Sequence, residues 1–310
     1  MENTQNLKKR LKSVANINKI TKAMELVAAT KMRRAQEIAL ASRPYAFTAL
    51  DLLANLTLLE IELPELLKPR RIKKVLFALV ASDKGLAGAF NSSLFRKFEK
   101  YILDKNYRDS SFVAVGEKTF SYLSRKGYRV IKKFTNVGDF TTPEQVHSLT
   151  DFLAKGYLNK DFDKVIIFSS HFKSALKQEP LIREILPVDF ESIKETIKEI
   201  VPQTGKFAEL MKQQNISFVT DKNKIKEYLI EPSPKVVLEK LSKHLFFMQV
   251  YHLIVEANAS EHAARRMAMK TASDNASELG EDLNLQYNKS RQGAITKEIT
   301  EIIAGAESLS

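Results

Sequence analysis

The turn after the first strongly apolar run is the part of this sequence most like a phosphate-binding loop. It reads SDKGLAG over residues 82–88. A loop that cradles phosphate and Mg²⁺ needs the G-x-G-x-x-G spacing or a Gly-Lys-Ser/Thr ending, because backbone N–H groups, lysine and hydroxyl each hold part of the ligand. The turn has neither pattern. The sequence therefore favours a tight turn into a helix that begins near Asn91 over a nucleotide site.

The other residues that could do acid–base or metal chemistry are not at catalytic spacings. His244 and His252 are eight residues apart, whereas a helical metal pair needs three or four. Glu278, Glu281 and Asp282 lie among polar residues, as on a solvated helix face. The sequence has no G-x-S-x-G elbow, no H-E-x-x-H and no cysteine, which excludes disulfides and thiolate metal sites. We expect no catalytic constellation, no bound metal and no cofactor.

Positive charge is concentrated near the start of the chain, which has 310 residues and a formal net charge of +12. Residues 1–43 contain ten Lys or Arg against three Glu, a net of +7. Residues 235–310 contain nine basic and ten acidic residues. The excess predicts an acidic partner, which could be nucleic acid, anionic lipid or acidic loops of another protein.

The two ends of the chain each predict a long helix. The first 43 residues contain neither proline nor glycine, and no proline follows Pro234. A helix over residues 235–303 would be about 100 Å long, far more than a small domain needs. Ser233 is the expected N-cap, with Pro234 as the first helical residue. The sequence therefore predicts a rod with a mechanical or scaffolding role.

Apolar stripes predict how these helices pair. In the first helix we expect the stripe to comprise Leu7, Leu11, Val14, Ile17, Ile20, Met24 and Val27. Pro44 is expected to bend this helix, and residues 50–59 to complete it before Pro64. The last helix carries a ladder of small residues at steps of four, namely Ala264, Ala268, Ala272 and Ala276. Two amphipathic helices at opposite ends of one chain predict an antiparallel coiled coil.

The intervening residues predict a doubly wound, Rossmann-like α/β domain, because strand and helix patterns alternate along them. The expected strands are residues 74–81, 112–115, 129–134, 165–169 and 181–188, and the expected helices are 92–103, 118–126 and 143–157. Residues 190–225 are rich in lysine and glutamate and fit neither pattern. The expected organisation is a coiled-coil helix over 1–62, the α/β domain over 70–230 and a long coiled-coil helix over 233–307.

Three segments together resemble the gamma subunit of F-type, proton-translocating ATP synthases. They are residues 20–32 (ITKAMELVAATKM), residues 82–91 (SDKGLAGAFN) and residues 259–302, which include ASEHAARRMAMK and YNKSRQGAITKEITEI. The resemblance covers both ends of the chain and the first strand. The middle agrees in pattern more than in residues.

The resemblance implies a non-catalytic central rotor shaft, an antiparallel coiled coil with an α/β domain near its base. The implied partners are the alpha and beta subunits of the catalytic head, the epsilon subunit and the membrane ring of c subunits. Rotation of the shaft would couple proton flow through the ring to ATP synthesis in the head. The implied location is peripheral, on the cytoplasmic face of a bacterial inner membrane, with neither nucleic acid nor a small-molecule substrate bound.

Individual positions follow from the same resemblance. The residues implied to contact the catalytic head are Met24, Lys84, Arg291, Gln292, Thr296 and Glu298, and those implied to contact the membrane ring are Tyr228 and Glu231. Two features depart from the family pattern: the 190–225 stretch is long, and Arg265 and Arg266 form a doubled arginine. The regulatory cysteine pair of the plastid type is absent.

The residues alone leave other interpretations open. A nucleic-acid-binding coiled coil would account for the basic first helix, although the chain has no tryptophan and its basic residues are not interleaved with stacking aromatics. An enzyme built on the α/β domain would need a ligand pocket. Met24 also fits an ordinary coiled-coil core, and Arg291 and Gln292 also fit a solvated helix face. The basic N-terminus also suits a transit peptide, although its pattern continues beyond the usual length.

Overall fold

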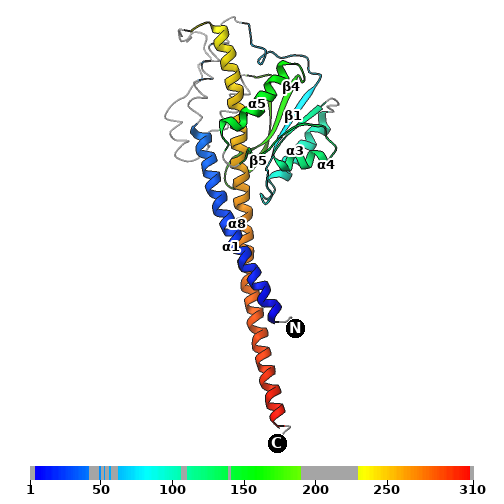
Figure 1. Cartoon of the computed structure of the whole chain (residues 1–310), viewed down its shortest axis with the longest axis vertical. Helices are drawn as coiled ribbons and strands as arrows, with labels where there is room; N and C mark the ends of the chain where they lie inside the picture. Colours follow the sequence, from blue (N-terminus) through cyan, green and yellow to red (C-terminus); the bar gives the residue numbers. More distant parts are fainter. Residues whose placement is uncertain are drawn as a thin grey trace. The chain divides into compact units, whose positions relative to one another are not determined.

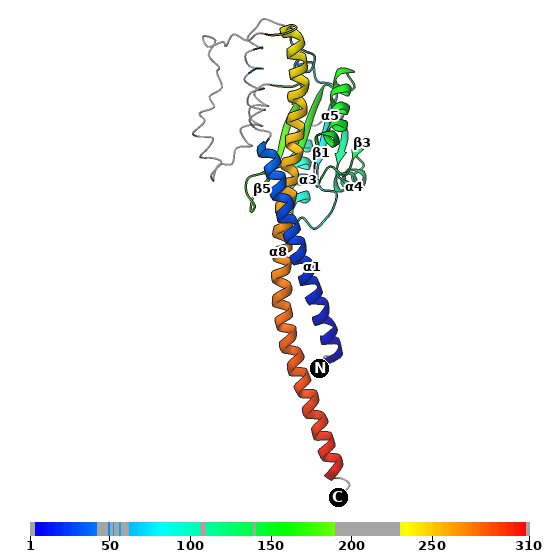
Figure 2. The same cartoon turned by 60° about the vertical axis from the view of Figure 1, so that its left-hand side comes forward.

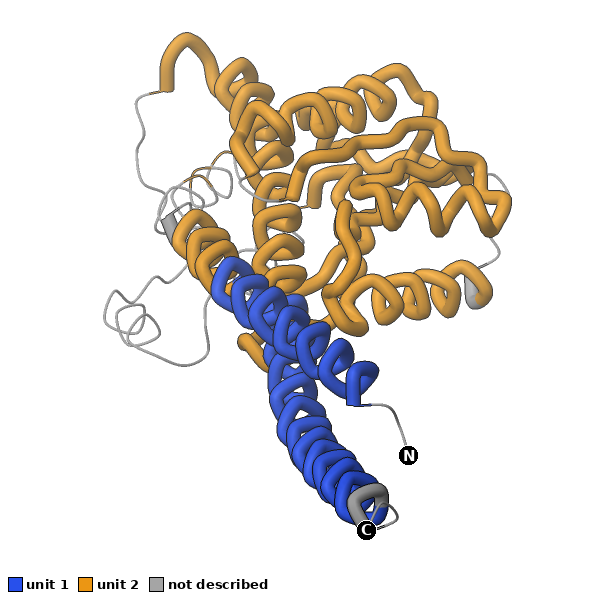
Figure 3. The backbone as a smooth tube through the Cα atoms, turned by 60° about the horizontal axis from the view of Figure 1, so that its bottom comes forward, with its two compact units in different colours: residues 1–28, 265–310 blue, residues 29–264 orange. Residues whose placement is uncertain are grey.

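The computed structural model describes residues 4–41, 49, 52, 56, 62–105, 110–138, 141–189 and 230–307. The chain forms two compact units, coloured separately in Figure 3. The coiled-coil unit comprises residues 1–28 and 265–310, and the sheet unit comprises residues 29–264. The bend expected at Pro44, most of the 50–59 segment and the 190–225 segment lie outside the described residues.

The sheet unit contains one five-stranded sheet in the order β3-β2-β1-β4-β5 (Figure 1). The strands are β1 (Val75–Val80), β2 (Ser110–Val115), β3 (Val130–Phe134), β4 (Lys164–Phe172) and β5 (Gln178–Leu186). The first four are parallel, and β5 runs antiparallel to β4. The intervening helices are α3 (Phe90–Lys105), α4 (Glu117–Arg125) and α5 (Pro143–Leu158). The predicted doubly wound α/β domain is confirmed.

The central strand β1 is apolar along its whole length because helices cover both faces of the sheet. Phe77 and Leu79 pack with side chains of α3 and α4, whereas Leu76 and Ala78 pack with those of α5 and α8 (Pro234–Glu307). Figures 1 and 2 show these helices on the two sides of the sheet. Burial on both faces explains why β1 reads as a continuous apolar run rather than an alternating one.

The helix α8 begins as the sequence predicts. Pro234 is its first residue, and the backbone N–H of Val236 lies 3.4 Å from the Ser233 hydroxyl oxygen that accepts its hydrogen bond. This bond satisfies a backbone N–H that the first turn of a helix leaves unpaired. Within the sheet unit, residues 249–263 of α8 are buried without a break. The first half of α8 is therefore part of the domain core rather than a surface helix.

In the coiled-coil unit, α1 (Thr4–Ala41) and α8 pair antiparallel, as predicted. The side-chain amide of Asn18 donates to the Ser277 hydroxyl at 2.8 Å, and its oxygen accepts from the Ser273 hydroxyl at 2.7 Å. Four residues earlier on α1, a Val14 methyl carbon lies 3.8 Å from the position of a β-carbon added at Gly280. Lower numbers on α1 thus meet higher numbers on α8.

The inward residues of both helices follow the heptad repeat of a left-handed coiled coil, with alternating steps of four and three. On α1 they are Leu7, Leu11, Val14, Asn18, Thr21, Glu25 and Ala28, and on α8 they are Met269, Ser273, Ala276, Gly280 and Leu283. The middle of this seam is polar or small rather than apolar. Hydrogen bonds and close backbone approach therefore replace much of the usual leucine packing there.

The predicted stripe on the first helix is wrong at Ile17, Ile20 and Val27, which are 51%, 59% and 54% exposed. The seam passes from Val14 to Asn18, four residues on, so these apolar residues lie on a neighbouring face. The alanine ladder meets the seam only at Ala276, since constant steps of four drift away from a repeat of 3.5 residues. Of its members in the coiled-coil unit, only Ala276 is buried.

The Asn18 hydrogen bonds give a first prediction. Replacing Asn18 with alanine removes both bonds to α8, and we expect the free energy of opening residues 4–28 to fall by about 1–2 kcal/mol. Hydrogen exchange of the α1 amides in the full chain measures this change. Asn16→Ala is the matched control, because Asn16 is exposed on the same helix and the change in helix propensity is identical. Equal loss of protection in both variants would contradict a stabilising role for the Asn18 bonds.

Candidate partner-binding surfaces

The first candidate surface is the outer apolar face of α1, which comprises Ile17, Ile20, Met24 and Val27. These residues recur at steps of three, four and three, so they share one side of the helix beside the seam. Met24 is half-buried, whereas the other three are exposed. A contiguous row of large exposed apolar side chains is characteristic of a protein–protein contact. In the described part of the chain nothing covers Ile17, Ile20 and Val27.

The second candidate surface is the C-terminal part of α8, where residues 291–304 are all exposed. Within the coiled-coil unit, α8 continues past the N-terminal end of α1 (Figures 1 and 3). This stretch nevertheless carries four isoleucines that are each about half exposed or more, namely Ile295, Ile299, Ile302 and Ile303. Apolar side chains of this size on an isolated helix need an outside partner.

The four α8 residues implied to contact the catalytic head share one half of the helix with these isoleucines. One row, at steps of four, three and four, is Arg291, Ile295, Glu298 and Ile302; its neighbour, at steps of four, three and four, is Gln292, Thr296, Ile299 and Ile303. We call these two rows the isoleucine face. The opposite half carries small or polar residues, including Lys297 and Glu301, whose side chains form an ion pair at 3.5 Å. The two halves of this helix end therefore differ, because only one of them carries large apolar side chains.

Hydrogen bonds among Ser82, Lys84 and Asn91 fix the turn that carries Lys84. Ser82 is buried, and its hydroxyl donates to the carbonyl oxygen of Lys84 at 2.7 Å. The Asn91 side chain accepts from the Ser82 backbone N–H at 3.1 Å and donates to the Ser82 hydroxyl at 2.7 Å. Lys84 itself is exposed. The tight turn predicted here is confirmed, since α3 begins at Phe90.

The same turn differs from a phosphate loop for a structural reason. The Asp83 carboxylate accepts from the backbone N–H of Glu117, the first residue of α4, at 2.9 Å and from that of Asn136 at 3.0 Å. Helix N-termini attract anions, and here the chain supplies the anion itself. Sequence reasoning missed Asp83 and Asn91; the only available signal was that Asp and Asn side chains commonly bond nearby backbone groups in turns.

The rest of the carboxyl edge of the sheet is also occupied by the chain. Doubly wound sheets bind ligands at this edge, where neighbouring strands connect in opposite directions, here β1 and β4. Beside β4, the buried Glu256 carboxylate of α8 contacts a His171 ring nitrogen, and the Ser260 hydroxyl donates to the carbonyl oxygen of Ser170 at 3.2 Å. The first half of α8 therefore lies where an enzyme built on a doubly wound sheet would be expected to bind a cofactor.

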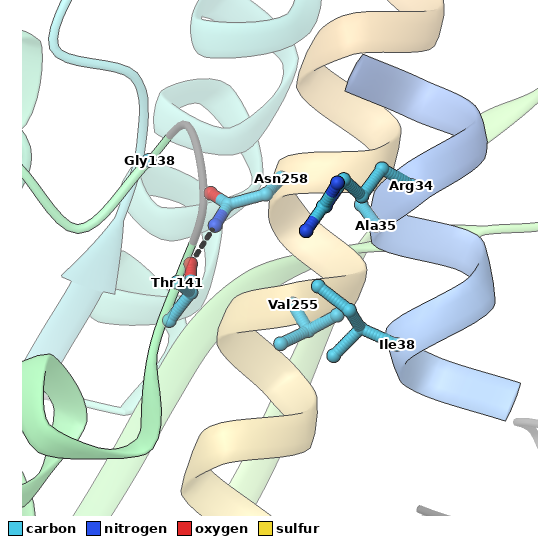
Figure 4. A pocket seen from close by; sticks show the side chains of 7 residues that line it. All are labelled: Arg34, Ala35, Ile38, Gly138, Thr141, Val255 and Asn258. Atoms are coloured by element: carbon cyan, nitrogen blue, oxygen red, sulfur yellow. Dashed lines mark hydrogen bonds between the residues drawn. The ribbon is translucent and has the colours of Figure 1, made fainter. Parts of the chain in front are cut away.

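A small hollow near this edge is shown in Figure 4. It is lined by Arg34, Ala35, Ile38, Gly138, Thr141, Val255 and Asn258. The Asn258 side chain donates to the Thr141 hydroxyl and, at 3.0 Å, to the carbonyl oxygen of Val137. The hollow has a volume of about 10 Å³, room for about one water molecule and far below the roughly 300–1,000 Å³ typical of small-molecule sites. Packing between elements explains this hollow better than a ligand.

At the other end of α8, Glu231 is exposed and lies just before the helix, whereas Tyr228 lies outside the described residues. The start of α8 is tied to the segment before β1, because the Lys235 ammonium lies 3.0 Å from the Glu62 carboxylate. Hydrogen bonds from Lys68 and Lys235 lower the pKa of Glu62 to about 2.

No helix in the described ranges is both long and apolar enough to cross a membrane.

The structure thus brings some implied site residues together and separates others. Arg291, Gln292, Thr296 and Glu298 share the isoleucine face, and Met24 lies on the other helix of the same unit. Lys84 and Glu231 belong to the sheet unit. The Thr296 hydroxyl donates within its own helix, to the carbonyl oxygen of Gln292 at 3.0 Å.

Comparison with known proteins gives the family. The model of the family described as ATP synthase matches residues 3–309. The ATP synthase gamma chain of Herpetosiphon aurantiacus is 37% identical, and the alignment covers 100% of this chain and 99% of that one. The gamma chain of Gloeobacter violaceus is 35% identical, with 99% of each chain covered.

Solved structures agree in fold. A chain from the central stalk and c-ring structure of the Tetrahymena thermophila mitochondrial ATP synthase has a TM-score of 0.56 and 22% identity, with 82% of this chain and 99% of that chain covered. A chain of the Euglena gracilis mitochondrial ATP synthase has a TM-score of 0.62 and 16% identity, with 99% and 94% covered. The full-length match to the family model and to bacterial relatives shows that this chain belongs to the ATP synthase family, as a gamma chain.

Proposed function

We propose that this gamma chain is the central rotor shaft of a proton-translocating F-type ATP synthase and performs no catalysis itself. The observation that carries the proposal is the isoleucine face, where the described part of the chain leaves four isoleucines on a helix end uncovered. A shaft standing inside a hollow head needs such a surface. The asymmetry between the two halves of this helix end would let rotation present different contacts to successive catalytic subunits.

The proposed contacts with the alpha and beta subunits of the head fall on three places. Arg291, Gln292, Thr296 and Glu298 supply polar contacts on the isoleucine face. Met24, with the outer apolar face of α1, supplies a second contact, and the basic residues of α1 favour an acidic loop on the partner. Lys84 supplies a third contact, and its side chain is positively charged like the basic residues of α1. These positions come from the resemblance, and their exposure or partial burial supports the proposal.

The proposed contact with the membrane ring of c subunits lies at the start of α8, at Glu231 and the neighbouring Tyr228. The epsilon subunit is the remaining proposed partner. A chain attached in this way is a peripheral membrane protein, and we place it on the cytoplasmic face of a bacterial inner membrane. The occupied carboxyl edge of the sheet supports a non-catalytic role, because α8 and Asp83 fill positions that a nucleotide would take.

Co-purification from native membranes tests the proposal. The tagged chain should recover alpha, beta, epsilon and c subunits in a complex that hydrolyses ATP. An Ile295→Ser, Ile299→Ser double variant should recover less of the head, because it removes two side chains from the isoleucine face. Recovery of the chain alone, or with nucleic acid in place of these subunits, would refute the rotor assignment.

A further inference from the structure

We propose that Asp83 is a positioning residue, which holds the Ser82–Gly88 turn in the shape that presents Lys84 and Leu86 to the catalytic head. This inference rests on the proposed function, since it deepens the Lys84 contact. It adds a residue that does not itself touch the partner. It also adds Leu86, which is 63% exposed in the same turn.

Asp83 connects three segments that are far apart in the sequence. Its two carboxylate oxygens accept separately, one from Glu117 at the start of α4 and one from Asn136 after β3. Both bonds are formed with backbone N–H groups, whose positions the sheet and helix fix. The carboxylate therefore ties the turn after β1 to the ends of β2 and β3.

The opposite side of the turn is fixed by Ser82 and Asn91, described above. Between these two attachments, the backbone at Leu86 has φ of +62°, a left-handed conformation that is unfavourable for a leucine. Such strain persists only where surrounding contacts determine the conformation. The attachments at Asp83, Ser82 and Asn91 supply those contacts. The Leu86 side chain is thereby held exposed, as is that of Lys84.

A carboxylate is the side chain best suited to this task. It offers two acceptor oxygens and a negative charge, and the N-terminus of α4 favours both. Asparagine keeps one acceptor but would turn its NH₂ group toward the second N–H donor. We therefore expect Asp83→Asn to be only partly functional and Asp83→Ala to release the turn from both segments.

The chain contains a matched control for loss of a carboxylate clamp. Asp163 accepts from the backbone N–H groups of Lys73 and Lys74 at 2.9 and 3.0 Å and pairs with Arg70 at 3.0 Å. These contacts lie before β1, at the amino end of the strand, whereas Asp83 follows its carboxyl end. Asp163→Ala removes a comparable clamp without touching the turn.

The experiment compares Asp83→Ala, Asp83→Asn, Lys84→Ala and Asp163→Ala in the purified, membrane-reconstituted complex. The readout is proton pumping per ATP hydrolysed, together with hydrogen exchange of the Glu117 and Asn136 amides. We expect Asp83→Ala and Lys84→Ala each to lower the pumping ratio at least about fivefold. Asp163→Ala should leave the ratio unchanged. Added formate should restore both the pumping ratio and the amide protection of Asp83→Ala, because it replaces the lost carboxylate.

The outcomes distinguish failure of the positioning role of Asp83 from failure of the Lys84 contact. Loss of pumping in Lys84→Ala but not in Asp83→Ala would refute positioning by Asp83 and leave the Lys84 contact standing. Equal loss in Asp163→Ala would also refute it, since general destabilisation would then explain the effect. An unchanged ratio in Lys84→Ala would overturn the contact on which the inference rests, whereas the rotor assignment is tested separately by co-purification.

Discussion

Replacing Gly116 with alanine is expected to lower the free energy of unfolding of the sheet unit by about 3 kcal/mol or more. Gly116 follows β2 with φ of +94°, and a β-carbon built there would lie 2.0 Å from the carbonyl oxygen of Ala81. That oxygen belongs to the backbone at the end of β1, so no side-chain rotation relieves the clash. The variant should shift the turn that follows Ala81 as well as destabilise the fold. Chemical denaturation of the full chain measures the loss.

Gly127→Ala is the control that separates backbone strain from steric overlap. Gly127 follows α4 with φ of +76°, and no atom lies within 4 Å of an added β-carbon. Its replacement should lower the free energy of unfolding by about 1 kcal/mol, the cost of placing alanine in the left-handed conformation. If both variants lost the same stability, the close approach of Gly116 to Ala81 would contribute nothing. Equal effects would also show that the end of β1 is free to move, contrary to the tight hydrogen bonding around Ser82.

Much of the fold could be predicted because its signals are local or compositional. β1 is a continuous apolar run, which only a strand covered on both faces requires. The long helices are marked by the absence of proline, and the start of α8 by Ser233 and Pro234 in adjacent positions. Each of these signals is confirmed, and together they determine the α/β domain and the paired termini.

The coiled-coil seam could be predicted only in part, because hydrophobicity does not say what a residue packs against. Ile17 and Ile20 are more apolar than Asn18 and Thr21, yet the latter lie inward. The apolar pair faces outward, where the described part of the chain provides no cover. Pattern analysis within one chain assigns every apolar stripe to that chain's own core. It therefore fails for an apolar row that the chain's own residues do not cover.

The contacts around Asp83 were beyond sequence reasoning for a different reason. Asp83 bonds Glu117 and Asn136, which are 34 and 53 residues away, and nothing in the local sequence specifies either partner. For this segment the sequence predicted a tight turn into a helix and the lack of a phosphate-loop pattern, but no partner for Asp83. The head and ring contacts came from family resemblance, since by pattern alone Met24 fits a coiled-coil core and Arg291 a solvated face.

Replacing Ile299 with aspartate should weaken assembly with the catalytic head about 100-fold or more, since an unpaired carboxylate would be buried in an apolar contact at a cost of several kcal/mol. Ile299 is 52% exposed in the chain, so the variant should fold as the wild type does. Recovery of alpha and beta subunits with the tagged chain measures the loss.

Thr300→Asp is the matched control, because Thr300 is the next residue and lies on the opposite half of α8, which already carries Lys297 and Glu301. Both variants add one negative charge to an exposed position on the same turn. If the isoleucine face is the side that contacts the head, only Ile299→Asp should reduce recovery of the alpha and beta subunits. Equal loss in both would mean that the head surrounds this helix without preference for a face. In that case the shaft's asymmetry would have to arise elsewhere, such as at the outer apolar face of α1.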